Sequence, residues 1–151
     1  MGLRETIEEA LKNALKAKAA DDVSALRMVR AAIQQRDIEN RGTGKPAASD
    51  EEVLQVMAKM VKQREESATA FDAGKRPELA VKERGEIALI LQFMPKQMDE
   101  AEIHAAAEAA VRETGAASIK DMGKVIAKLR EKHAGQMDFG KASAIVKSLL
   151  G

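Results

Sequence analysis

Hydrophobic residues recur every three or four positions along most of the 151-residue chain, which is the spacing of one face of an α-helix. No segment alternates apolar and polar residues between turn residues, as a half-buried β-strand would. The predicted fold class is therefore all-α. The pattern predicts seven helices, over residues 3 to about 19, 22 or 23 to about 41, 50 to about 73, 77–94, 100–114, 119–133 and 139–150.

Start and stop signals support these helices. The segments Ser49–Glu52 and Asp99–Glu102 read as capping boxes, in which a side chain at each end satisfies a free N–H of the helix start. Pro77 suits a first helical turn, whereas Pro95 ends the fourth helix and is the predicted domain boundary. The chain is thus expected to form a four-helix lobe over residues 1–95 and a three-helix lobe over residues 96–151.

The predicted core is aliphatic, because the chain has three Phe and neither Trp nor Tyr. Helical spacing places Leu15 on the inward stripe of the first helix, Ile38 on that of the second and Leu149 on that of the seventh. The absence of Cys fits a reducing compartment and excludes disulfides, Cys-ligated zinc and thiol nucleophiles. A charged N-terminus and the lack of any apolar run of ~20 residues indicate no signal peptide, no membrane span and a cytoplasmic location.

The sequence contains no metalloprotease, nucleophile-elbow, phosphate-loop or EF-hand motif. His104 and His133 are predicted on different helices, the first solvated and the second favourable to the helix dipole. We therefore expect no catalytic residues, no metal, no cofactor and no small-molecule substrate. Arg64 falls on a core stripe, and its guanidinium is expected to pair with Glu83 or Glu86 on the next helix; an anion or RNA contact at Arg64 is the alternative.

Charge is unevenly distributed although the net charge is only +1. Residues 115–151 carry seven Lys and Arg against three Asp and Glu, a local +4. Two glycines, Gly123 and Gly140, fall early in predicted helices, where each lowers helix stability by about 1 kcal/mol relative to Ala. Either a neighbouring backbone packs closely against them, or free N–H groups at the helix start meet an anion such as phosphate. The candidate RNA-binding residues are Lys120, Gly123, Lys124, Lys128, Lys132, Gly140 and Lys141.

A family resemblance spans nearly the whole chain. The chain is similar to the GatB/YqeY family in the following segments, in this order: Leu26–Met28, Lys62–Arg64 with Ser67, Gly74–Arg76 with Glu78 and Leu79, Glu83 with Glu86 and Ile87, Met94 and Pro95 with Gln97 and Met98, Met122–Val125, and Gly135–Ser143. The resemblance implies a two-lobe helical fold. It also implies a C-terminal lobe similar to the tail that helps hold tRNA in the B subunit of glutamine-dependent tRNA amidotransferases.

Three functional hypotheses follow. The favoured one is a non-catalytic accessory module that binds tRNA or another structured RNA through the basic residues named above, by electrostatic and shape-based contacts. The second is a protein-interaction module whose Ala-rich C-terminal lobe docks on a synthetase or an amidotransferase subunit. The third, implied by the resemblance alone, is participation in carbon–nitrogen ligase activity with glutamine as amido donor.

Overall fold

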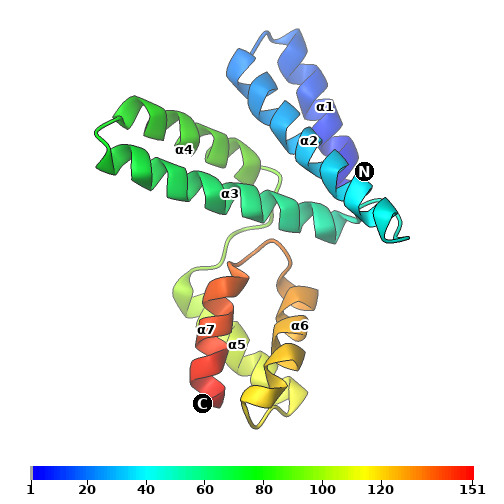
Figure 1. Cartoon of the computed structure of the whole chain (residues 1–151), viewed down its shortest axis with the longest axis vertical. Coiled ribbons are helices and arrows are strands. Elements are labelled where there is room, and N and C mark those ends of the chain that lie inside the picture. The colour runs from blue at the N-terminus through cyan, green and yellow to red at the C-terminus, as the bar shows by residue number, and fades with distance from the viewer. Residues whose placement is uncertain (1) are drawn as a thin grey trace. The chain divides into compact units, whose positions relative to one another are not determined.

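The computed structural model describes residues 2–151, and these form an all-helical protein without a β-strand (Figure 1). The predicted all-α class is confirmed. In chain order the helices are α1 (Leu3–Lys16), α2 (Ala20–Gly42), α3 (Asp50–Ala73), α4 (Pro77–Leu91), α5 (Glu100–Thr114), the short 3-10 helix η1 (Ile119–Asp121), α6 (Met122–His133) and α7 (Phe139–Leu150).

The chain divides into two compact units, and the division falls between Met94 and Pro95. Unit 1 contains α1 to α4, and unit 2 (Pro95–Gly151) contains α5, η1, α6 and α7. Among the described residues, no helix combines the length and hydropathy that a membrane crossing requires.

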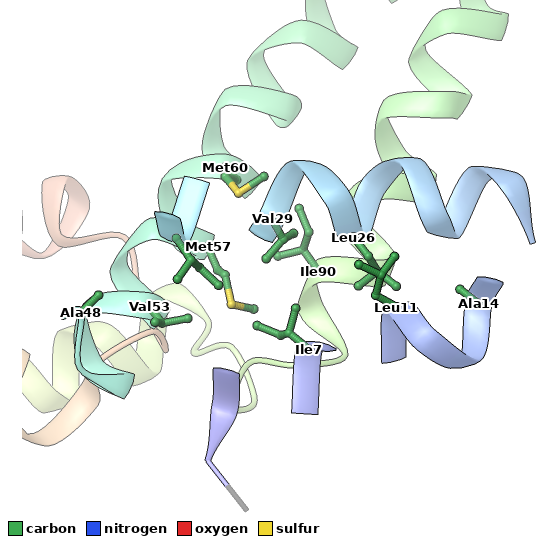
Figure 2. Packing of buried hydrophobic residues seen from close by; sticks show 11 residues of the cluster. Ile7, Leu11, Ala14, Leu26, Val29, Ala48, Val53, Met57, Met60 and Ile90 are labelled. Atoms are coloured by element: carbon green, nitrogen blue, oxygen red, sulfur yellow. The ribbon is translucent and has the colours of Figure 1, made fainter. Parts of the chain in front are cut away.

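Unit 1 consists of two helical hairpins, α1–α2 and α3–α4, whose helices run side by side (Figure 1). Leu11 and Leu26 meet inside the first hairpin, and Ile90 of α4 lies close to Val29 of α2 (Figure 2). Met57 lies in the same cluster, where its flexible thioether fills space that an aromatic ring would occupy in other cores. The core is therefore aliphatic, with methionine as the filler.

The second half of α2 departs from the predicted stripe. Ile38 is 57% exposed, and the inward positions around it are held by Asp37 and by Asn40, which is buried. Asp37 accepts two hydrogen bonds from the Arg4 guanidinium, at 2.9 and 3.0 Å, and Asn40 donates to Glu52 at 3.1 Å. The expectation that Ile38 faces inward is wrong, because polar ties between helices take the inward positions.

Two other predicted core residues face solvent. Leu15 is 48% exposed because α1 ends at Lys16, three residues earlier than predicted, and the chain turns through a left-handed residue at Lys18. Leu149 is also exposed, in the last turn of α7. The fourth helix likewise ends early, at Leu91. The following N–H groups donate three residues back in a tightened turn, consistent with the bias of the residue before Pro95 away from the α conformation.

Unit 2 packs three short helices around small aliphatic side chains. Its buried cluster includes Ala107 of α5, Val125 and Leu129 of α6, and Val146 of α7. The segment before α5 is fixed by two hydrogen bonds: Met98 N–H donates to Gln136 O at 2.8 Å, and Gln97 Nε2 donates to Gly135 O at 2.7 Å. These bonds join the entry of unit 2 to its α6–α7 turn.

Both predicted capping boxes are present. The Ser49 hydroxyl accepts from Glu52 N–H and the Glu52 carboxylate accepts from Ser49 N–H at the start of α3. Asp99 and Glu102 form the same reciprocal pair at the start of α5. Ser118, predicted to cap the sixth helix, instead forms a box with Asp121 around η1, which runs directly into α6.

Acid sensitivity in unit 1 should depend on Asp37. Hydrogen bonds from the Arg4 guanidinium and from Ala48 N–H lower the pKa of Asp37, so the unfolded chain takes up a proton before the native one. The stabilisation is therefore complete above the unfolded pKa of about 4 and is lost as pH falls through the lower native value. We expect Asp37→Asn to lower the free energy of unfolding by about 1–2 kcal/mol at neutral pH. The variant should also lose less stability than the wild type as pH falls below about 4. Urea unfolding followed by circular dichroism at several pH values would measure both effects.

Asp22→Asn is the matched control, because Asp22 is exposed in the first turn of α2 and has no ion pair among the described residues. An acid decline as steep in Asp37→Asn as in the wild type would contradict the assignment.

Candidate nucleic-acid interface

A line of lysines runs along η1 and α6 in unit 2. Lys124 and Lys128 are four residues apart on α6, which places their side chains on one helix face about 6 Å apart, and Lys120 precedes Lys124 by four residues, in η1. We call these three residues the α6 lysine face. Lys120 and Lys124 are exposed and Lys128 is half-buried, and none of the three has an ion pair within 4 Å in the part of the chain that the structure describes. Their charge is therefore available to an external anion.

Lys132 continues the same line but is engaged within the protein. Its Nζ lies 2.6 Å from one carboxylate oxygen of Glu113 on α5 and 2.7 Å from the other. This bond, reinforced by the nearby charge of Lys128, lowers the pKa of Glu113. Of the sequence-predicted lysines, Lys132 is thus the one whose charge is already neutralised.

Gly123 lies between Lys120 and Lys124 on an open stretch of backbone. A Cβ placed on Gly123 would meet no atom within 4 Å outside its own helix backbone and chain neighbours. Close packing of a neighbouring backbone is therefore wrong as the reason for this glycine. The open side leaves room for a ligand to approach the α6 start, which has no side-chain cap.

The start of α7 is different, because the protein caps it with its own carboxylate. Asp138 accepts a hydrogen bond from Gly140 N–H at 2.8 Å. The hypothesis that Gly140 offers a free N–H to an anion is therefore wrong. Lys141 follows on the same turn and is exposed, without an ion pair among residues 2–151.

The two glycines do not form one site. A Cβ on Gly151, at the end of α7, would lie 3.6 Å from Ile119 Cδ1, so the end of α7 is beside the start of α6. The start of α7, with Gly140, must then be at the other end of the unit, about 16 Å away at the helical rise of 1.5 Å per residue. Gly123 and Lys141 thus mark opposite ends of unit 2.

Asp121 introduces a negative charge at the N-terminal end of the α6 lysine face. Its carboxylate accepts hydrogen bonds from Ala117 N–H at 2.9 Å and Ser118 N–H at 3.4 Å, and these bonds, with the charge of Lys124, lower its pKa. The carboxylate therefore fixes the turn before α6 and stays ionised. Sequence reasoning missed this role, although the spacing of Ser118 and Asp121 is itself a capping-box pattern.

Three further polar side chains have partners inside unit 2. The Arg130 guanidinium lies 5.5 Å from the centre of the Phe139 ring, in a cation–π contact. His104 Nδ1 lies 3.0 Å from Glu108, and His133, the last residue of α6, has Nδ1 3.3 Å from Gln136 Oε1. Across residues 2–151, no three His, Cys, Asp or Glu side chains are grouped so that they could hold a metal ion.

Arg64 is a nearly buried cation of unit 1 with three hydrogen-bond partners. Its Nε donates to Glu86 at 2.9 Å, and the two side chains are only 13% and 14% exposed. Nη1 donates to Met60 O at 3.2 Å, and Nη2 donates to Met28 Sδ at 3.5 Å. Of the two carboxylates considered from sequence, Glu86 and not Glu83 is the partner, and the guanidinium joins α2, α3 and α4.

Glu86→Ala should destabilise the protein by about 3 kcal/mol, because it leaves the Arg64 charge nearly buried without its partner. The double variant Arg64→Met with Glu86→Leu should recover much of that loss, since removing both charges avoids the uncompensated desolvation. Chemical unfolding would measure both effects. Glu83→Ala, one turn earlier on α4, is the matched control and should stay within about 0.5 kcal/mol of the wild type; an equal loss in the two single variants would contradict the pairing.

The sequence matches the model of the Yqey-like protein family over residues 4–150, and the chain belongs to that family. An uncharacterized protein of Schizosaccharomyces pombe is 29% identical over 94 residues, which cover 62% of this chain and 73% of the relative. Altered inheritance of mitochondria protein 41, mitochondrial, of Saccharomyces cerevisiae is 32% identical over 84 residues, which cover 56% of this chain and 44% of that protein.

Proposed function

We propose that unit 2 is a non-catalytic module that binds the phosphate backbone of tRNA or another structured RNA. The observation that carries the proposal is the α6 lysine face, three cations without an ion pair beside the open backbone of Gly123. Phosphate contacts made by lysine are electrostatic and tolerate many sequences, so such a face fits a shape-dependent rather than a base-specific reader.

The chemistry of the unit favours backbone contacts over base stacking. Phe139, the one aromatic residue of unit 2, already lies under Arg130. A platform of exposed rings, on which single-stranded bases would stack, is therefore not what this unit offers. Lys141, at the far end of the unit, supplies a second basic point for a ligand long enough to reach it.

The substrate class in this proposal comes from the resemblance to the tail of the amidotransferase B subunit, which helps hold tRNA. The match to the Yqey-like family supports the wider GatB/YqeY grouping within which that resemblance was drawn. We propose that unit 2 acts as such a grip. Docking on a synthetase or amidotransferase, and a contribution to glutamine-dependent amidation, remain the alternative proposals. The cytoplasmic location inferred from the sequence also stays a prediction, because the Saccharomyces cerevisiae relative is named as a mitochondrial protein.

A salt titration of tRNA binding tests the α6 lysine face. Lys124→Glu with Lys128→Glu should weaken binding at every salt concentration, because it removes two phosphate contacts. The slope of log K against log salt should also become shallower by about 1.4 to 1.8. Fluorescence anisotropy with labelled tRNA would measure both quantities.

Lys12→Glu with Lys16→Glu on α1 is the matched control, because it makes the same change in net charge on exposed lysines of unit 1. An equal loss of affinity in the two double variants would mean that net charge, and not this face, determines binding. Binding that both variants leave unchanged would contradict the α6 lysine face as the binding site.

A further inference from the structure

A groove on unit 1 has no part in the proposed RNA contact. It is lined by residues of α2, of the end of α1 and of the turn between them, and has a volume of about 680 Å³. Its lining is mainly apolar and contains no carboxylate. The residues that matter for the argument are Leu15, Lys18, Val23, Arg27, Met28 and Ala31.

Two large apolar side chains of this groove are exposed to solvent. Leu15 is 48% exposed and Met28 is 37% exposed, although a buried core lies directly on the other side of the same helices. Met28 is held in place by Arg64, whose Nη2 donates to its sulfur at 3.5 Å. The groove wall is therefore a positioned apolar surface, of the kind that marks an interaction site when it is large enough.

The rim of the groove is cationic. Lys18 and Arg27 line it, and neither has an ion pair among the residues that the structure describes. Elsewhere in unit 1, arginines at positions 4, 30, 36, 64 and 84 each pair with a carboxylate. Lys18 also adopts a left-handed conformation, with φ 55°, which is costly for a residue with a side chain. The rim thus keeps two positive charges available beside an apolar floor.

We infer that this groove docks an amphipathic α-helix of a partner protein, with leucine-like anchors on one face and carboxylates along its flank. Val23 to Ala31 spans about 12 Å of α2, which is the length of two to three turns of a bound helix. Lys18 and Arg27 select acidic flanks because they would repel basic ones. An RNA fits this floor poorly, because aliphatic side chains give bases no ring to stack on.

Two synthetic peptides test the inference on the full chain. Both are stapled helices of about 12 residues with leucines at i, i+3 and i+7, matching a helix-in-groove contact. One carries glutamates on its flanks, and the other carries lysines at the same positions. Fluorescence anisotropy should show the glutamate peptide binding at least about tenfold more tightly than the lysine peptide. Arg27→Glu should reduce or reverse that preference, and Leu15→Ser with Met28→Ser should abolish binding of both peptides.

Ile38→Ser is the matched control, because Ile38 is a more exposed apolar residue of the same helix and lies outside the groove. It should leave peptide binding unchanged, and circular dichroism should show that every variant stays helical. Equal binding of the two peptides, binding that survives loss of Leu15 and Met28, or no binding at all would overturn the inference. A dimer in sedimentation that Leu15→Ser dissolves would assign the groove to a second copy of this chain and would overturn it as well.

Discussion

Unit 1 is organised around the nearly buried Arg64 guanidinium, which contacts α2, α3 and α4. A core of Ala, Val, Ile, Leu and Met offers many weak contacts but few that specify how two helical hairpins should cross. The Arg64 guanidinium adds one directed contact between the hairpins, from its Nη2 on α3 to Met28 Sδ on α2, whereas its bonds to Glu86 and Met60 O lie within the α3–α4 hairpin. Hydrogen bonds from Arg36 and Asn40 on α2 to Glu52 on α3 join the same two hairpins. The Nη2 contact also positions Met28 in the groove of unit 1, so the packing of the hairpins and the shape of that groove are linked.

Unit 2 is organised by its ends and turns more than by any central polar group. Asp99, Asp121 and Asp138 each use a carboxylate to satisfy backbone N–H groups at a helix start or the turn before it. This leaves most of its lysines without internal partners. These three carboxylates therefore serve the backbone, and the surplus of basic charge in residues 115–151 stays largely unpaired on the surface of the unit.

Much of the fold was predictable from the sequence, because periodicity and caps are local signals. The capping boxes at Ser49 and Asp99 mark the starts of α3 and α5 correctly. The exposure of Ile38 could not be predicted from sequence. It results from the inward positions of Asp37 and Asn40, whose hydrogen-bond partners Arg4 and Glu52 belong to other helices. Lys132 has the same spacing as the other lysines, and its pairing with Glu113 follows only from the packing of α5 against α6. The groove of unit 1 could not be predicted either, because helical spacing placed Leu15 in the core, whereas it is exposed in the structure.

The contact between Arg130 and Phe139 has an optical consequence. With neither Trp nor Tyr in its sequence, the protein has almost no near-ultraviolet absorbance or fluorescence of its own. A tryptophan at position 139 would keep a ring beneath the guanidinium, and indole is the strongest partner for such a cation. That indole would be the single chromophore of the chain, placed at the junction of α6 and α7. Its emission would change when a ligand displaces Arg130 from the ring, and the rest of the protein would add almost no fluorescence to the signal.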